Sequence, residues 1–280
     1  MKKTRAFVMG YPVKHSRSPM LHGYWLKKYA IEGSYEHAEV APEALDGFFD
    51  GFRDAGWVGG NVTVPHKLAV IPHLDRIDAA AEALGAVNTI WWEGDSLVGG
   101  NTDWTGVLGN LDELAPGWDR DAGKAVVIGA GGAARAAAYA MKSRGLVVAF
   151  ANRTTEKAEG LAAHFGGMTG HGLDALPWLM RDADILVNTT SLGMHGSPPL
   201  ELDLATLKPS AVVHDVIYVP LETDLLKQAK ARGHRTVDGL GMLLHQAVDG
   251  FHHWFGTRPV VTPELRQVLV DDIRAGKPDV

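Results

Sequence analysis

The sequence predicts an α/β protein of two domains, an N-terminal α/β domain and a Rossmann-type dinucleotide-binding domain. Candidate strands and helices alternate along almost the whole chain. The length of 280 residues exceeds what one hydrophobic core comfortably serves. A turn-rich break at Ala115-Pro116-Gly117 is followed by a new strand and a glycine-rich turn, which indicates where the second domain begins.

The first part of the chain alternates extended and helical patterns. Short apolar runs predict strands, and apolar residues at helical spacing predict helices. The predicted strands cover residues 6–9, 35–40 and 58–64, and the predicted helices cover 19–29, 44–55, 67–74 and 79–84. A hairpin of residues 87–92 and 96–98 turns about Glu93-Gly94-Asp95, and a helix over 104–114 leads to the break.

A complete βαβ unit follows the break and predicts a parallel sheet. Its strands cover residues 125–128 and 147–151, and its helices cover 133–143 and 156–165. Further strands fit 185–188 and 212–215. After Asp238-Gly239 a long amphipathic helix is predicted from apolar residues at helical spacing, namely Leu240, Leu243, Leu244, Ala247, Val248, Phe251, Trp254 and Phe255.

Composition excludes several classes of protein. Apolar residues make up 46% and charged residues 21%, as in ordinary globular domains. The chain has no cysteine, which excludes disulfides, thiolate catalysis and cysteine-ligated metals. A net charge of -6 provides no general basic field for nucleic acid or anionic membrane. With no export signal, and no apolar run near the roughly 18 residues of a membrane span, we expect a soluble, cytoplasmic protein.

A glycine-rich turn between a predicted strand and a predicted helix matches the dinucleotide-binding fingerprint. It reads Gly129-Ala130-Gly131-Gly132-Ala133. Gly129 allows the tight turn, and Gly131 allows the backbone to approach a pyrophosphate, whose charge the first helical amides would meet. A purely structural turn is the alternative, and the strand-to-helix context favours the nucleotide site.

The end of the following strand indicates NADP. A site for NAD carries Asp or Glu there to bind the ribose 2′-hydroxyl, whereas this chain reads Asn152-Arg153-Thr154. The Arg153 guanidinium can pair with a 2′-phosphate and stack on adenine, and Asn152 and Thr154 add neutral donors. Lys157 fits phosphate contact or a solvated helix face equally well, and an exposed loop arginine is the alternative for Arg153.

Two hydroxyls precede the first predicted helix. Ser18 can cap this helix, with Pro19 at its first position. Ser16 and Ser18 can also clamp a carboxylate, because helix amides and the helix dipole attract anions to the same place. Both interpretations stay open on these residues alone.

An amine and a carboxylate are candidates for acid–base chemistry. Lys67 is expected in the first turn of a helix that begins beyond Pro65, where the macrodipole favours the neutral amine. Asp103 is a helix cap or first-turn acid, or it pairs with Lys67 to orient a substrate hydroxyl. Asn88 is polar within an apolar strand, so it needs a partner, either internal or substrate.

Taken together, these segments resemble the shikimate dehydrogenase family. The match runs nearly end to end, and the blocks occur in order. They are His15-Ser16-Arg17-Ser18-Pro19, Asn61-Val62-Thr63-Val64-Pro65-His66-Lys67, Gly85-Ala86-Val87-Asn88-Thr89, Asn101-Thr102-Asp103, Gly129-Ala130-Gly131-Gly132-Ala133, Asn152-Arg153-Thr154, Asp215-Val216-Ile217-Tyr218 with Pro220, and Asp238-Gly239-Leu240-Gly241-Met242-Leu243-Leu244-His245-Gln246.

The resemblance implies roles for individual residues. Lys67 and Asp103 would form the catalytic pair, with no metal. Other residues would bind the ligands: Ser16 and Ser18 the substrate carboxylate, Thr63, Asn88 and Gln246 the ring hydroxyls, Tyr218 the substrate, and Gly239 and Met242 the nicotinamide half of the cofactor. Residues 1–104 plus 240–280 would form the substrate domain and 105–239 the NADP-binding domain, with the C-terminal helices returning to the substrate domain and the site in the cleft between the two.

The implied reaction is the reversible NADPH-dependent reduction of 3-dehydroshikimate to shikimate, a step toward chorismate and the aromatic amino acids. The expected partner is this small molecule, with no nucleic acid and no membrane, and the chain is expected to be a monomer or homodimer. Trp104 and Val107 replace residues that are small in the family. A quinate/shikimate dehydrogenase or an aminoshikimate-type paralogue is therefore the alternative, and a non-catalytic NADP-binding sensor is disfavoured because Lys67 and Asp103 are both present.

Overall fold

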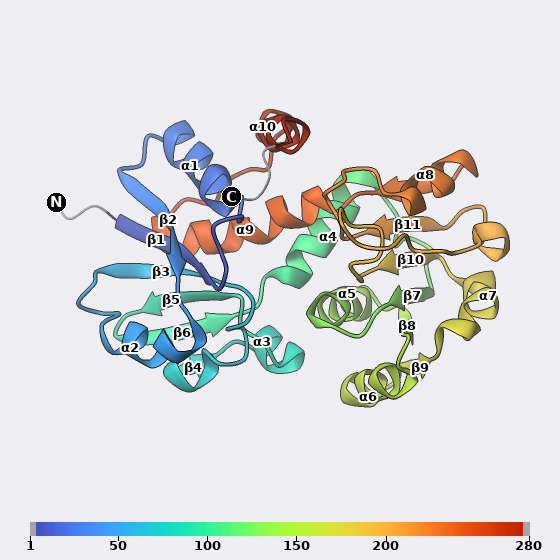
Figure 1. Ribbon diagram of the computed structural model, residues 1–280, viewed down its shortest axis with the longest axis horizontal. Helices are drawn as coiled ribbons and strands as arrows, with labels where there is room; N and C mark the ends of the chain where they lie inside the picture. The colour runs from blue at the N-terminus through green and yellow to red at the C-terminus, as the bar shows by residue number, and fades with distance from the viewer. Residues whose placement is uncertain (1–3, 277–280) are drawn as a thin grey trace. The chain divides into compact units, whose positions relative to one another are not determined.

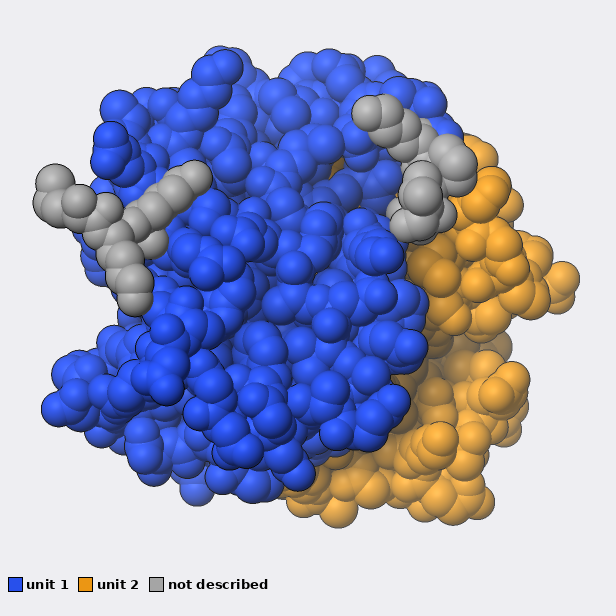
Figure 2. Space-filling view, turned by 60° about the vertical axis from the view of Figure 1, so that its left-hand side comes forward, with its two compact units in different colours: residues 1–102, 246–280 blue, residues 103–245 orange. Residues whose placement is uncertain are grey.

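The computed structural model describes residues 4–276 of the chain, which forms two compact units (Figure 2). Unit 1 comprises the residues up to Thr102 and those from Gln246 onward, and unit 2 comprises Asp103–His245. The chain therefore passes from one unit to the other twice, once at the start of helix α4 (Asp103–Leu114) and once within helix α9 (Leu240–Phe255). The sequence places these two boundaries after residues 104 and 239.

Unit 1 is built on a six-stranded mixed sheet in the order β2-β1-β3-β5-β6-β4 (Figure 1). The strands are β1 (Thr4–Gly10), β2 (Gly33–Glu39), β3 (Trp57–Val62), β4 (Arg76–Ile77), β5 (Thr89–Glu93) and β6 (Ser96–Gly100). β1 runs parallel to β2 and β3, whereas β5 is antiparallel to β3 and β6. The predicted hairpin is confirmed, and Gly94 in its turn has φ +62°.

Apolar side chains cover both faces of this sheet. Phe7 and Met9 of β1 pack in one core cluster with Phe52, while the alternating Ala6 and Val8 pack in another. A strand that is buried on both faces of its sheet has a continuous apolar sequence, as residues 6–9 do. The helices of the unit are α1 (Ser18–Lys28), α2 (Leu45–Asp50), α3 (Ala79–Leu84), the C-terminal half of α9 and α10 (Pro263–Arg274), with 3₁₀ turns η1 (Pro42–Ala44) and η2 (Ile71–His73).

The predicted helix over residues 67–74 is wrong. Turns occupy this segment up to the short η2, which contains Pro72. Proline has no amide to donate within a helix and disfavours the helical region for the residue before it, so an α-helix cannot run through Ile71 and Pro72 without a kink. The predicted helix over 44–55 is also too long, because α2 ends at Asp50.

Unit 2 is built on a six-stranded, wholly parallel sheet in the order β12-β11-β10-β7-β8-β9 (Figure 1). The strands are β7 (Lys124–Ile128), β8 (Val147–Ala151), β9 (Thr169–His171), β10 (Ile185–Asn188), β11 (Val212–Asp215) and β12 (Arg235–Val237). Read from β9, the order is 3-2-1-4-5-6, that of the Rossmann fold. The order reverses between β7 and β10, where such sheets bind their ligands.

Helices connect these strands, and the predicted βαβ unit is confirmed. The helices are α4, α5 (Gly132–Ser143), α6 (Thr155–Phe165), α7 (Leu176–Leu179), α8 (Asp224–Ala231) and the start of α9, with 3₁₀ turns η3 (Leu173–Ala175), η4 (Met180–Asp182) and η5 (Leu204–Thr206). The sequence did not indicate α7, α8, β9 or β12, because these are short and lack a long apolar period. Within residues 4–276, no helix combines the length and apolarity needed to cross a membrane.

Candidate active site

The glycine-rich turn connects β7 to α5 where the strand order of unit 2 reverses. Gly129 has φ +117°, and a Cβ there would lie 2.5 Å from Thr189 Oγ1, so only glycine fits. A Cβ on Gly131 or Gly132 would meet no described atom within 4 Å other than those of its chain neighbours and of the helix backbone next to it. Open space therefore borders the start of α5, which has no side-chain cap, and a phosphate can reach the helix amides there.

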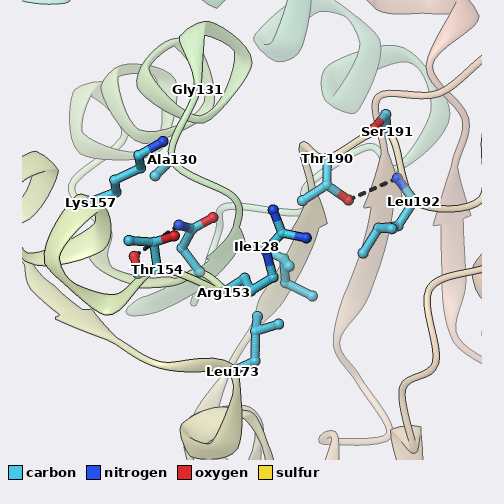
Figure 3. Close-up of a pocket in the computed structure, with 11 residues that line it drawn as sticks. Ile128, Ala130, Gly131, Arg153, Thr154, Lys157, Leu173, Thr190, Ser191 and Leu192 are labelled. Carbon is cyan, nitrogen blue, oxygen red and sulfur yellow. Dashed lines mark hydrogen bonds between the residues drawn. The ribbon is translucent and has the colours of Figure 1, made fainter. Parts of the chain in front are cut away.

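A hollow of about 360 Å³ lies beside this turn (Figure 3). Six of the residues predicted to bind the cofactor line it, and they come from two β–α connections and the first turn of α6. They are Ala130, Gly131, Asn152, Arg153, Thr154 and Lys157. Gly129, Gly132 and Ala133 belong to the same turn but are not among the lining residues.

The charge of the hollow is positive. Its lining includes the exposed side chains of Arg153 and Lys157 and no acidic residue. Asn152 Nδ2 donates to the Thr154 carbonyl oxygen (2.9 Å), which shapes the loop that carries Arg153. In Figure 3 the Arg153 guanidinium extends toward Ile128 and Thr190, while the Lys157 amine lies near Ala130. Such a lining suits an anion next to an apolar ring.

The opposite wall of the hollow was missed by the sequence reasoning. It consists of Thr190, Ser191 and Leu192, and Ile128 and Leu173 complete the lining. The available signal was a run of hydroxyl side chains directly after strand β10, since polar residues at the carboxyl ends of parallel strands gather at one edge of a sheet.

Gly239 is needed for close backbone packing. A Cβ there would collide with the Val216 carbonyl group, and the Gly239 amide donates to the Ile217 carbonyl oxygen (3.0 Å). Asn110 Nδ2 donates to the Asp238 carbonyl oxygen (2.6 Å) just before α9. These contacts fix the start of α9, whose first turn carries Met242, against the segment that continues into Tyr218.

In unit 1, the prediction that Ser18 caps α1 is wrong. The N-cap is Arg17, and α1 begins at Ser18. The Ser18 amide instead donates to Ser16 Oγ (3.3 Å). Arg17 forms a largely buried ion pair with Asp272 of α10 (2.9 Å), and His37 Nε2 lies 3.0 Å from the Ser16 carbonyl oxygen. Ser16, in the loop before α1, and Ser18, the first residue of α1, are therefore held in place from two other elements, α10 and β2.

Lys67 lies in the turns that follow β3 and not in the first turn of a helix, so the expectation that the macrodipole of its own helix favours the neutral amine is wrong. Its carbonyl oxygen accepts from the Val87 amide (2.8 Å). The next residue, Asn88, accepts the Thr102 amide at Oδ1 (2.8 Å), and Asp103 follows Thr102 in the chain. Two consecutive residues thus tie the backbones of Lys67 and Thr102 to the start of β5. Thr63, at the end of β3, is held by a bond from its amide to the Met9 carbonyl oxygen (2.8 Å).

Asn88 belongs to a buried polar network, so it has internal partners. Its Nδ2 donates to Thr102 Oγ1 (3.2 Å), and Thr102 Oγ1 lies 3.4 Å from Gln246 Oε1. Asn61 Nδ2 donates to the Asn88 carbonyl oxygen (3.2 Å), and Tyr35 donates its hydroxyl to Asn61 Oδ1 (2.6 Å). The network joins two predicted substrate residues, Asn88 and Gln246, to the edge strand β2.

His22 lies fully buried beside this network. Its ring stacks on Tyr35 (4.0 Å between centroids) and on Phe251 (5.9 Å). Burial lowers the pKa of His22 to about 3, and the neighbouring Asn61 offsets only part of this. The imidazole is therefore neutral at physiological pH, and the polar interior of unit 1 carries no charge at this position.

Trp104 contacts a residue of its own unit. Its indole meets Tyr139 of α5 edge to face, with 5.2 Å between ring centroids. The bulky residue next to Asp103 is thus part of the packing between α4 and α5.

Comparisons with known proteins agree with these features. A family model described as shikimate dehydrogenase substrate binding domain matches residues 8–90, and one described as shikimate / quinate 5-dehydrogenase matches 116–195. A shikimate dehydrogenase (NADP(+)) of Azorhizobium caulinodans is 54% identical over 273 residues, which cover 97% of each chain.

Two solved structures share the fold over nearly their whole lengths. The crystal structure of shikimate 5-dehydrogenase from Thermus thermophilus in complex with NADP(H) and shikimate has a TM-score of 0.85 at 36% identity, covering 96% of this chain and 99% of that one. Quinate dehydrogenase from Corynebacterium glutamicum in complex with NAD has a TM-score of 0.87 at 30% identity, with the same coverage. The chain belongs to the shikimate dehydrogenase family.

Proposed function

We propose that this protein catalyses the reversible NADPH-dependent reduction of 3-dehydroshikimate to shikimate. The observation that carries the proposal is the hollow at the switch point of the parallel sheet, whose lining holds Arg153 and Lys157 and no acid. A 2′-phosphate is what distinguishes NADP from NAD, and two cations in this position favour it. The curated relative of Azorhizobium caulinodans carries the same activity in its name.

In this proposal the cofactor residues divide by chemistry. The turn formed by Gly129, Ala130, Gly131, Gly132 and Ala133 receives the pyrophosphate on backbone amides. Arg153 and Lys157 bind the 2′-phosphate, with Asn152 and Thr154 as neutral donors. Gly239 and Met242, at the start of α9, lie along the nicotinamide half.

The substrate residues divide between the two ends of the ring. Ser16 and Ser18 hold the carboxylate, and the amide of Ser18 already orients the Ser16 hydroxyl. Thr63, Asn88 and Gln246 bind the ring hydroxyls, and the network through Thr102 presets the last two. Tyr218 contacts the substrate from the segment that Gly239 packs against.

The reaction adds a hydride to the ketone carbon and a proton to its oxygen. Bound NADPH supplies the hydride. Lys67 donates the proton as the alkoxide develops, and in the reverse direction it accepts the proton from the hydroxyl. Asp103 accepts a hydrogen bond from the substrate hydroxyl and orients the reacting carbon. We infer that the backbone tie through Val87 and Asn88 helps to position both residues.

Quinate is the alternative substrate. The quinate dehydrogenase of Corynebacterium glutamicum shares the fold and was solved with NAD, and Trp104 replaces a residue that is small in the family. The positive lining of the hollow favours NADP, and with it the shikimate reaction. We further propose that the enzyme works in the cytoplasm as a monomer or homodimer, which light scattering of the purified protein would determine.

A four-way assay tests the proposed function. The purified protein is given shikimate or quinate together with NADP or NAD, and formation of the reduced nicotinamide is followed by absorbance. The expected result is a kcat/KM at least about tenfold higher for shikimate with NADP than for any other pair. Equal or better rates with quinate and NAD would reject the assignment, and no turnover with any pair would favour a non-catalytic NADP-binding sensor.

A further inference from the structure

A buried carboxylate, Asp215, lies at the carboxyl ends of the parallel strands of unit 2, the same end of the sheet as the hollow described above. Asn188 ends β10 and Asp215 ends β11, and the two residues pair in the parallel register. Both are 0% exposed, and Thr223 beside them is 1% exposed. None of the three lines the hollow, and none is among the residues assigned to cofactor or substrate binding.

Asp215 accepts three hydrogen bonds. Thr223 Oγ1 donates to Oδ2 (2.7 Å), and Asn188 Nδ2 and the Ile217 amide donate to Oδ1 (3.1 Å each). Burial raises the pKa of Asp215 to about 6 despite these donors. At neutral pH the group is therefore an ionised carboxylate without solvent contact, a state that lowers stability compared with a neutral side chain.

The carboxylate helps to determine which way the Asn188 amide faces, together with the Thr190 amide and the Leu192 carbonyl oxygen. An ionised carboxylate only accepts hydrogen bonds, so Asn188 must direct Nδ2 toward Asp215 and leave Oδ1 for other partners. Oδ1 then accepts from the Thr190 amide (3.1 Å) and from Thr190 Oγ1 (2.8 Å). Nδ2 also lies 3.3 Å from the Leu192 carbonyl oxygen.

These bonds fix the wall of the hollow formed by Thr190, Ser191 and Leu192. With its hydrogen donated to Asn188, Thr190 Oγ1 accepts from the Leu192 amide (3.2 Å), as the dashed line in Figure 3 shows. Successive hydrogen bonds therefore connect Leu192 to Thr190, Thr190 to Asn188 and Asn188 to Asp215, and they hold the wall in this conformation. Asparagine in place of Asp215 offers one acceptor and one donor where the carboxylate offers two acceptors, so the bonds from Thr223, Asn188 and the Ile217 amide can no longer all be kept as they are.

We propose that Asp215 is a positioning residue for the nucleotide site, acting through the Asn188 amide on the Thr190–Leu192 wall. The inference rests on the proposed function, because the wall matters for binding only if NADP occupies the hollow. Asp215 does not touch the hollow itself, so its effect on nucleotide binding is transmitted by Asn188.

The test compares Asp215→Asn with Asp184→Asn. Asp184 immediately precedes β10, at the opposite end of the strand from Asn188, and accepts from the amides of Gly123 (2.8 Å) and Lys124 (3.0 Å) and from Lys208 Nζ (2.8 Å). Each variant keeps the side-chain shape and removes a hydrogen-bonded carboxylate. Calorimetry measures the Kd for NADP and for adenosine 2′-phosphate, circular dichroism checks the fold, and steady-state assays give the KM for shikimate.

Asp215→Asn is expected to raise the Kd for NADP about tenfold while the KM for shikimate stays within about twofold. Asp184→Asn is expected to leave the Kd within about twofold of wild type. If Asp215→Asn does not fold, Thr223→Val replaces it. Its Kd for NADP is expected to rise about threefold, and Thr223→Ser is expected to return the Kd to the wild-type value.

The inference alone would be overturned if folded Asp215→Asn bound NADP as wild type does. Where Asp215→Asn does not fold, the same result with folded Thr223→Val would overturn it. A wild-type protein that binds neither nucleotide would overturn the proposed function as well.

Discussion

The two units bury polar groups of opposite character. Unit 1 encloses His22, whose pKa is lowered to about 3, between the rings of Tyr35 and Phe251 and beside a network of neutral amides and hydroxyls. Unit 2 encloses Asp215, whose pKa is raised to about 6, among donors. Burial disfavours the charged form in both places. The consequence differs, because at neutral pH His22 is uncharged while Asp215 is ionised and orients its neighbours.

This difference predicts opposite pH dependence of stability. The folded pKa of His22 lies below its ordinary 6.5, so its contribution is complete above pH 6.5 and is lost as the pH falls toward 3. The folded pKa of Asp215 lies above its ordinary 3.8, so its contribution is complete below pH 3.8 and is lost as the pH rises through about 6. Acid therefore weakens the first site and strengthens the second.

The largest expected effect concerns the chemistry assigned to unit 1. Lys67→Ala should lower kcat about a thousandfold, or roughly 4 kcal/mol, because the developing alkoxide loses its proton donor. The Kd for NADP should stay within about twofold, since Lys67 belongs to unit 1 and the hollow to unit 2. Stopped-flow turnover and calorimetry measure the two quantities. A variant that loses nucleotide affinity in parallel with turnover would argue against this division of roles.

The next effect concerns the buried histidine. His22→Leu should flatten the loss of stability between pH 6.5 and about 4, where wild type should lose on the order of 3 kcal/mol at this site. Urea unfolding at a series of pH values gives the slope. The control is His252→Leu, on the exposed side of α9, which should leave the slope as in wild type. Parallel curves for His22→Leu and wild type would show that the histidine is not the source of the acid sensitivity.

A smaller effect concerns the choice of cofactor in unit 2. Arg153→Ala should raise the KM for NADP about thirtyfold, or roughly 2 kcal/mol, because the 2′-phosphate loses a paired cation. The KM for NAD should change by less than about twofold. Arg232→Ala removes another exposed arginine of the unit, one that pairs with Asp203 (3.3 Å), and should change neither constant. Unchanged affinity for NADP in Arg153→Ala would refute the assigned role.

Features formed by residues close together in the chain could be predicted from the sequence, whereas features formed by distant residues could not. The βαβ unit and the turn at Gly129 are confirmed because their signals lie within a few adjacent residues. The turns around Lys67 replace the expected helix because Pro72 outweighs the apolar spacing. The roles of single side chains in substrate binding remain predictions.

Features built by distant residues were not predictable from the sequence. Asn188 and Asp215 are 27 positions apart and meet only because β10 and β11 pair in register. Likewise, Thr102 and Gln246 are 144 positions apart and approach only once the chain has returned to unit 1. An isolated Asn or Asp at a strand end carries no local sign of its partner, so the sequence left the partner of Asn88 open and gave Asp215 no role.

The smallest effect concerns the network of unit 1. Tyr35→Phe removes one hydroxyl, which donates to Asn61 (2.6 Å), and keeps the ring stacked on His22. The KM for shikimate should rise about threefold, because Asn61 supports the carbonyl of Asn88, while the Kd for NADP stays as in wild type. Steady-state kinetics and calorimetry separate the two. A change in nucleotide affinity alone would contradict the assignment of this network to the substrate.

The most direct measurement of the central claim is a crystal structure of the protein with NADP and shikimate bound. We expect Lys67 Nζ and an Asp103 carboxylate oxygen within about 3.2 Å of the same substrate hydroxyl, on the carbon that faces the nicotinamide ring. We also expect the 2′-phosphate to bind Arg153. Lys67 and Asp103 on separate outer surfaces, with only solvent between them, would disprove the proposed catalytic pair.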